Sequence, residues 1–203
     1  MKHHLMIAAA LVALGGPALA QSQGEWTLGL GLANVNPKSD NGTLAGGTVP
    51  TDIDSSTRPT ITAEYFIRDN LGVELLAALP FRHAITSNGV EIGTVKQLPP
   101  VLSLQYHFDA TKQFKPFVGL GVNFAGFWDG DARGPLAGSE LRVKNSWGLA
   151  AHLGGDYWIN DRAAIRADLR WIDIDSNVEL NGTRIGKVEI DPLVVGISYV
   201  MKF

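Results

Sequence analysis

The sequence predicts an all-β protein: an eight-stranded antiparallel transmembrane β-barrel with short periplasmic turns and long extracellular loops. Three observations predict this fold class. The first residues have the pattern of a secretion signal, apolar side chains alternate with small or polar ones along eight segments, and the connections between these segments alternate in length. Strands of this kind cross a lipid bilayer with one apolar face turned to the lipid.

Residues 1–20 have the order of a secretory signal peptide. Lys2 lies in a short positive segment, an apolar stretch follows it, and the A-x-A pattern at 18–20 predicts cleavage after Ala20. The apolar stretch is shorter than the roughly 20 residues that a membrane-spanning helix needs. We therefore expect residues 21–203 to form the mature chain as a single barrel domain.

The composition argues against several classes of function. The formal net charge is −3, with 17 Lys and Arg against 20 Asp and Glu, which disfavours a nucleic-acid partner. The absence of cysteine excludes disulfides, thiolate metal sites and a cysteine nucleophile. The five histidines lack the spacing of a metal site, and no glycine-rich segment completes a nucleotide-binding motif. We expect neither a metal nor a cofactor.

Two-residue alternation is the main secondary-structure signal. In the first predicted strand, Trp26, Leu28, Leu30 and Leu32 share one face, while small residues fill the other. Successive strand side chains point to opposite faces, so each strand has one apolar face and one small or polar face. The predicted strands cover residues 26–35, 58–67, 71–78, 100–108, 117–125, 146–159, 163–174 and 188–203.

The connections predict the orientation of the barrel. Short turns are expected at 68–70, 109–115 and 160–162, and long loops at 36–57, 80–99, 126–145 and 175–187. In membrane barrels the short turns are periplasmic and the long loops are extracellular. An even number of strands then brings both ends of the mature chain to the periplasmic side.

The last residues favour a membrane barrel over a soluble one. A soluble sandwich or barrel shows the same alternation, but turns its apolar face inward. Here Tyr199, Met201 and Phe203 alternate with other residues up to a terminal aromatic side chain. This pattern resembles the signal by which the outer-membrane assembly machinery recognises its clients, so these three residues are the expected assembly signal.

The chain resembles the OmpW family of outer-membrane proteins in the order and spacing of short segments. These are DNLGVELLAA at 69–78, PFRH at 80–83, LPP at 98–100, QYHF at 105–108, FKPFVG at 114–119, SWGLAA at 146–151, DLRWIDID at 168–175 and IDP at 190–192. The long loops show little that matches. The resemblance implies an eight-stranded barrel with a narrow hydrophobic channel in a Gram-negative outer membrane. It also implies movement of small hydrophobic molecules, since relatives include alkane-uptake proteins.

The inward-facing positions divide the predicted lumen into two halves. Charged and polar residues are expected to form a plug at the periplasmic end: Glu64, Glu74, His107, Asp156, Arg166, Asp168 and Arg170. Apolar residues are expected to form a funnel above it, open to the outside: Leu76, Ala78, Val101, Ala125, Ala150, Ile172, Ile190 and Val194. The interior of an eight-stranded barrel is barely wide enough for side chains, so the charges should pair and close the bottom.

This division predicts uptake of small hydrophobic solutes with lateral release into the bilayer. An apolar funnel suits such a solute, and the charged plug blocks a straight path through the barrel. Pro99 and Pro100, at the head of the fourth strand, cannot donate ladder hydrogen bonds and are the expected position of a lateral opening. A structural or strand-initiating role is the alternative for these prolines. A lumen filled by its own side chains, without any cavity, would contradict the hypothesis.

Two other functions stay open at this stage. A non-transporting structural barrel, or a receptor to which phages or toxins dock, needs no cavity at all. A lipid-modifying barrel enzyme needs a nucleophile and a base, for which inward-facing Ser103, His107 and His152 are the candidates. Because lumen histidines more often belong to polar networks, we expect no enzyme activity.

Overall fold

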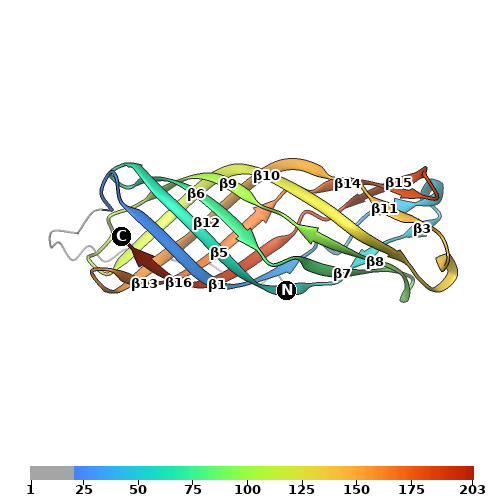
Figure 1. Ribbon diagram of the computed structural model, residues 1–203, viewed down its shortest axis with the longest axis horizontal. Coiled ribbons are helices and arrows are strands. Elements are labelled where there is room, and N and C mark those ends of the chain that lie inside the picture. Colours follow the sequence, from blue (N-terminus) through green and yellow to red (C-terminus); the bar gives the residue numbers. More distant parts are fainter. Residues whose placement is uncertain (1–20) are drawn as a thin grey trace, which may run out of the picture.

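A closed barrel of eight antiparallel strands forms the body of the molecule (Figure 1). The computed structural model describes residues 21–203, and the expected signal peptide, residues 1–20, lies outside them. Each strand pairs with the next, and the last pairs with the first. The barrel strands are β1 (Trp26–Asn36), β5 (Ser56–Arg68), β6 (Leu71–Ala78), β9 (Val101–His107), β10 (Phe114–Ala132), β12 (Ser146–Asn160), β13 (Ala163–Ile172) and β16 (Leu193–Lys202). The predicted fold class is confirmed.

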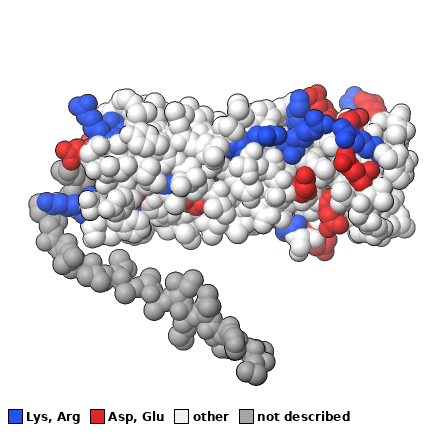
Figure 2. All heavy atoms as spheres, turned by 90° about the horizontal axis from the view of Figure 1, so that it is seen from below, with Lys and Arg blue, Asp and Glu red and all other residues white. Residues whose placement is uncertain are grey.

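The outer surface of the barrel carries a broad apolar band. Leu30, Leu120 and Ile197 are more than half exposed. Figure 2 shows Lys, Arg, Asp and Glu gathered toward the two ends of the molecule, with a mostly uncharged surface between them. Aromatic pairs stand at the edges of this band, for example Trp26 with Tyr65 at a centroid distance of 4.9 Å. Such girdles lie at membrane–water interfaces, so the band is the lipid-facing surface.

The predicted long loops are largely made of strands, which is a correction to the sequence-based assignment. The additional strands are β2 (Thr43–Leu44), β3 (Val49–Pro50), β4 (Asp52–Ile53), β7 (Phe81–Ser87), β8 (Val90–Leu98), β11 (Leu141–Val143), β14 (Asp175–Leu180) and β15 (Thr183–Glu189). One group, β4, β7 and β8, joins the upper part of β10, and the other forms a separate five-stranded sheet. Both extend the barrel beyond the membrane, at the right of Figure 1.

Two tight turns explain why these segments fold into hairpins. Asn88-Gly89 joins β7 to β8, and Asn181-Gly182 joins β14 to β15. All four residues have positive φ, between 48° and 79°. A two-residue turn with two positive φ angles matches the twist of a hairpin, and Asn-Gly is its preferred sequence. The polar and glycine-rich composition had suggested irregular loops.

The last predicted strand is also shorter than expected. Residues 188–203 are divided between β15, which ends at Glu189, and β16, which begins at Leu193. Pro192 cannot donate a ladder hydrogen bond, and Asp191 has a positive φ of 34°. The chain therefore turns at this point. Two 3₁₀ turns, η1 (Ala45–Gly47) and η2 (Gly134–Leu136), complete the assigned elements, and no described helix is long and apolar enough to cross a membrane.

Candidate functional site: the barrel lumen

Arg166 is the centre of an ion network in the periplasmic half of the lumen. Its guanidinium donates to Asp156 Oδ1 at 2.6 Å, to Glu74 Oε2 at 2.7 Å and to Glu64 Oε2 at 3.2 Å. Its Cζ lies 4.7 Å from the centroid of the Phe117 ring. The three carboxylates and the guanidinium are buried. Buried charges persist only when they are paired in this way, so the network closes the lumen.

Arg170 continues the network toward the outer end. It donates to Glu74 Oε1 at 2.7 Å and to Ser103 Oγ at 3.3 Å, and its Nε lies 3.9 Å from Asp168 Oδ1. Gly196 is the cross-strand partner of Asp168. A Cβ at Gly196 would overlap the Asp168 carboxylate. The glycine therefore leaves the space that this carboxylate occupies.

A chain of polar side chains completes the plug. His107 Nε2 lies 2.9 Å from Glu64 Oε1, and Gln105 Nε2 donates to both oxygens of Glu64 at 3.1 Å. His152 Nε2 lies 2.7 Å from Gln105 Oε1. The structure thus brings all seven residues of the predicted plug together, although the contact between Asp168 and Arg170 is looser than the others.

Phe117 and Gln21 also belong to the plug region, and neither was identified from the sequence. Phe117 stacks on Arg166, and Gln21 donates to Asp156 Oδ2 at 3.4 Å. Phe117 sits at an inward position of the alternating pattern, so its place could have been found. Gln21 precedes the first strand, and no periodic signal covers it.

The apolar half of the lumen is a packed column. Its residues belong to one buried cluster that runs from the barrel into the two outer sheets, where Phe81, Val95 and Val143 contribute. Leu76 and Ala78 pack against this cluster, and the other predicted funnel residues are members of it: Val101, Ala125, Ala150, Ile172, Ile190 and Val194. The residues come together as predicted, but the outer hairpins cover them, so the column is closed and is not the open funnel that we expected.

Two small cavities interrupt this packing. The upper one is lined by apolar residues together with Gln97 and Thr60, and the lower one adjoins Glu74 and Arg170 of the plug. Each has a volume of about 20 Å³, which is room for about one water molecule. They are stacked along the lumen, because both are lined by Ala33, Thr60, Leu76 and Val194.

The hydrogen-bonded wall is interrupted beside the upper cavity. The ladder between β6 and β9 ends at the pair Leu76 and Val101, and the ladder between β7 and β8 begins at Phe81 and Gln97. Pro99 lies in the interval and lines the upper cavity. The Pro100 carbonyl accepts a hydrogen bond from the Phe124 amide at 3.1 Å, so this residue is tied to β10. Both predicted prolines therefore lie where the ladder is broken.

A second interruption lies between β10 and β11. Among the described residues no ladder joins the upper part of β10 to β11, which pairs with β14. A groove of about 430 Å³ follows this seam. Buried Phe127 and Val143 line it together with exposed Trp128 and Arg142. The seam thus reaches from the outer surface to the apolar column.

Comparison with known proteins identifies the family of this barrel. The OmpW family model matches residues 22–203. The chain belongs to the OmpW family. Outer membrane protein W of Escherichia coli (strain K12) is 38% identical over 198 residues, covering 94% of this chain and 93% of that protein. Outer membrane protein AlkL of Ectopseudomonas oleovorans is 30% identical over 195 residues, covering 88% of this chain and 83% of that protein.

A solved structure shows the same architecture. The crystal structure of the outer membrane protein OprG from Pseudomonas aeruginosa has a TM-score of 0.79 and 33% sequence identity, covering 90% of this chain and 97% of that chain. This OmpW-family chain is therefore an outer-membrane β-barrel, as the sequence predicted. Tyr199 and Phe203 are exposed at the end of the chain, and the role of Tyr199, Met201 and Phe203 in assembly stays a prediction.

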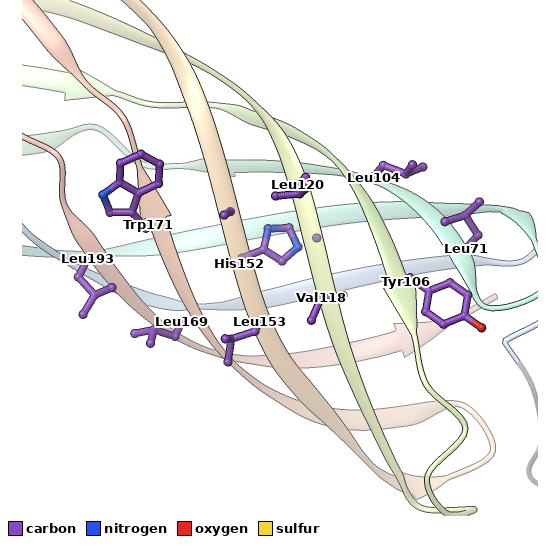
Figure 3. Close-up of a pocket in the computed structure, with 12 residues that line it drawn as sticks. Leu71, Leu104, Tyr106, Val118, Leu120, His152, Leu153, Leu169, Trp171 and Leu193 are labelled. Atoms are coloured by element: carbon purple, nitrogen blue, oxygen red, sulfur yellow. The ribbon is translucent and has the colours of Figure 1, made fainter. Parts of the chain in front are cut away.

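A larger hollow of the OmpW-family barrel lies on its outer wall (Figure 3). It has a volume of about 620 Å³ and is lined by outward leucines, Val118, Tyr106 and Trp171. The small side chain of Ala151, which pairs with outward Leu120, lowers the surface at this point. Most of the lining side chains, such as Leu120 and Trp171, are exposed on the outer wall, and buried His152 borders the hollow from the lumen side. The hollow is therefore part of the lipid-facing surface. The lumen is the better candidate for a solute.

One group of carboxylates lies close together at the outer end. Oxygens of Asp173, Asp175 and Asp191 are within 4.8 Å of one another. Lys38 Nζ is 3.0 Å from Asp191 and Lys187 Nζ is 2.6 Å from Asp175. These lysines offset part of the negative charge. The expectation that the chain holds no metal stays a prediction.

Proposed function

We propose that this barrel takes up small hydrophobic molecules from the outside and releases them sideways into the outer-membrane bilayer. The observation that carries the proposal is the position of the upper apolar cavity, which Ala78 lines on β6 and Pro99 lines at the interruption of the wall. The family resemblance, which implies movement of small hydrophobic molecules, supports the same function.

The ion network supports a closed lower end. A solute that continued straight downward would have to separate Arg166 from three buried carboxylates. Breaking a buried ion network leaves charges without partners in a region of low dielectric constant, which is strongly unfavourable. A hydrophobic solute gains nothing from such charges, so its route leaves the lumen above Arg170.

The apolar column supports the proposal that the solute is hydrophobic. Withdrawing apolar surface from water gains about 25 cal/mol per Å². Ile172, Val194 and Leu76 supply such an environment next to the two cavities. The same gain is available in the bilayer core, so a solute that reaches the column can pass into the lipid without a large change in free energy.

Uptake requires movement of the outer sheets. Phe81 and Val95 pack on the column from above, and neither cavity has room for more than about one water molecule. The β7–β8 hairpin must therefore shift to admit a solute. This movement also widens the interval between the two ladders, because Phe81 and Gln97 form the first pair above it.

Uptake of a hydrophobic dye tests the proposal. Cells with complete lipopolysaccharide exclude such a dye, and cells that express the barrel should admit it at a several-fold higher rate. Ala78→Leu fills the upper cavity and should abolish the gain. Ala77→Leu adds the same volume on the opposite face of β6, where Ala77 pairs with outward Ile61, and should transport normally.

Leakage of a hydrophilic sugar from vesicles is the companion measurement. The ion network predicts no leakage, and leakage would mean that the barrel is a polar pore. If the barrel does not raise dye uptake, or if Ala77→Leu and Ala78→Leu are equally impaired, the lumen route is wrong.

A structural or receptor barrel is the second candidate, favoured by the tight packing of the apolar column beneath two folded outer sheets. Such a protein needs rigid outer strands and no solute path, and it would transport neither dye nor sugar. Enzyme activity has less support. Ser103 is hydrogen-bonded to Arg170, and His152 is hydrogen-bonded to Gln105. Among the described residues, neither histidine is therefore hydrogen-bonded to Ser103 as a base would be to a nucleophile.

A further inference from the structure

Gln97 is a polar side chain within the apolar column. It lies on β8, is fully buried and lines the upper cavity. Neither its amide nitrogen nor its amide oxygen has a hydrogen-bond partner of normal geometry. Buried amides are almost always hydrogen-bonded, and an unsatisfied one lowers stability. The neighbouring side chain that interacts with the amide is His83, but one ring nitrogen cannot satisfy both polar atoms of the amide, so Gln97 has room for a further partner.

His83 provides a second such group next to Gln97. The two residues lie diagonally across the β7–β8 ladder on its buried face, since Phe81 pairs with Gln97 and His83 pairs with Val95. His83 Nδ1 is 2.8 Å from the Asp54 carbonyl oxygen. A carbonyl only accepts, so the neutral ring donates from Nδ1 and leaves Nε2 as an acceptor. Nε2 also lacks a partner of normal geometry.

Together these groups provide one donor atom, Gln97 Nε2, and two acceptor atoms, Gln97 Oε1 and His83 Nε2, among apolar side chains. Among the residues that line the upper cavity none is charged: besides Gln97 and Thr60, all are apolar. An ionised ligand would lose its hydration there without gaining a counter-charge, which is strongly unfavourable. A neutral hydroxyl or carbonyl group would instead find a hydrogen-bond partner in the Gln97 amide.

We propose that Gln97, assisted by His83, binds the polar end of neutral amphipathic solutes such as medium-chain alcohols and phenols, while their apolar part lies along the column. This inference rests on the proposed function and specifies its solute class. The solute hydroxyl accepts from Gln97 Nε2 and donates to Gln97 Oε1 or His83 Nε2. It replaces the single water molecule for which the cavity has room.

Matched probes test this assignment: 1-octanol and n-octane share an alkyl chain and differ in the hydroxyl. The full mature barrel, embedded in lipid nanodiscs and labelled with ¹⁵N in its glutamine side chains, is titrated with each. The Gln97 signal, identified by its loss in Gln97→Leu, should shift saturably with octanol and stay unchanged with octane. Equal responses to both probes, or none to octanol, would overturn the inference.

Uptake by cells separates this inference from the proposed function. Gln97→Leu should lower octanol uptake about tenfold, as expected when a hydrogen bond of about 1.4 kcal/mol is lost, and should leave octane uptake unchanged. The exposed Gln113→Leu should change neither. If the wild type admits neither probe, the proposed function fails. If Gln97→Leu admits octanol and octane as the wild type does, only the binding role of Gln97 is wrong, and Gln97 binds water rather than the solute.

Discussion

Glu64 and Glu74 lie directly opposite each other on β5 and β6, with both carboxylates inside the barrel. Like charges at opposed positions of an antiparallel pair repel one another. Arg166, from β13 across the lumen, bonds to both and also to Asp156. The guanidinium thus converts a repulsive pair into a connection between opposite walls of the barrel.

Replacement of Arg166 should therefore be strongly destabilising. Arg166→Met leaves three buried carboxylates without their shared partner, and removing one member of a buried ion pair costs roughly 3–5 kcal/mol. Urea unfolding of the barrel in lipid vesicles, followed by tryptophan fluorescence, measures the change. Arg162→Met, in the exposed turn between β12 and β13, is the control and should alter stability by less than about 0.5 kcal/mol. Equal unfolding midpoints for the two variants would rule out the bridging role.

The plug could be predicted because its position follows from the simplest regularities of a barrel. Inward and outward residues alternate, and each hairpin fixes the height of its two strands. Counting from the short turns therefore placed Glu64, Glu74 and Arg166 at one level, and electrostatics required that they meet. The exact partners, such as the single contact of Arg170 with Asp168, depend on side-chain rotamers that no pattern reveals.

The outer half could not be predicted in the same way. Whether the apolar column is open depends on Phe81 and Val95, which belong to a hairpin in a segment that the sequence predicts to be a loop. Alternation was present in that segment, and Asn88-Gly89 marked its turn. The path of this hairpin over the lumen, however, is set by tertiary packing. The cavity at Gln97 follows from that packing and has no signal in the sequence.

Gly119 and His152 should show coupled effects on stability. They are cross-strand partners on β10 and β12, and a Cβ at Gly119 would overlap the His152 ring. Gly119→Ala should displace the ring, break its hydrogen bond to Gln105 and destabilise the barrel by about 1–3 kcal/mol. In a His152→Ala background the same change should cost much less. A double-mutant cycle on urea unfolding measures the coupling, and simple additivity of the two changes would refute the steric explanation.

Acidification should loosen the β7–β8 hairpin through His83. Burial lowers the pKa of His83 below its ordinary value of 6.5, and Asp54 offsets this only in part. The unfolded chain then binds a proton at a higher pH than the folded chain does. The free energy of unfolding therefore keeps its full value above a pH of about 6.5 and decreases as the pH falls below it. The urea midpoint should drop between pH 7.5 and pH 5, and His83→Gln should reduce the drop. An identical drop in both proteins would exclude His83 as its source.

A disulfide across the interrupted ladder should block lateral release. The β6–β9 ladder ends at the pair Leu76 and Val101; if its register is extended by two residues, Ala78 faces Pro99 across the interval, and both residues line the upper cavity. A disulfide needs a Cα separation of about 4.4–6.8 Å, so the bond, once formed, holds the two strand ends together across the interval. The chain has no cysteine of its own. Oxidised Ala78→Cys/Pro99→Cys should therefore show no dye uptake above background, and a reducing agent should restore it.

The matched control for this variant lies on the same ladder. Leu75 and Leu102 are paired and face the lipid, so a disulfide in Leu75→Cys/Leu102→Cys locks strands that are already hydrogen-bonded and should leave uptake unchanged. Loss of uptake in both oxidised variants would point to general rigidity of the barrel. Undiminished uptake in oxidised Ala78→Cys/Pro99→Cys would move the exit away from Pro99, and the seam between β10 and β11 would then be the next opening to close.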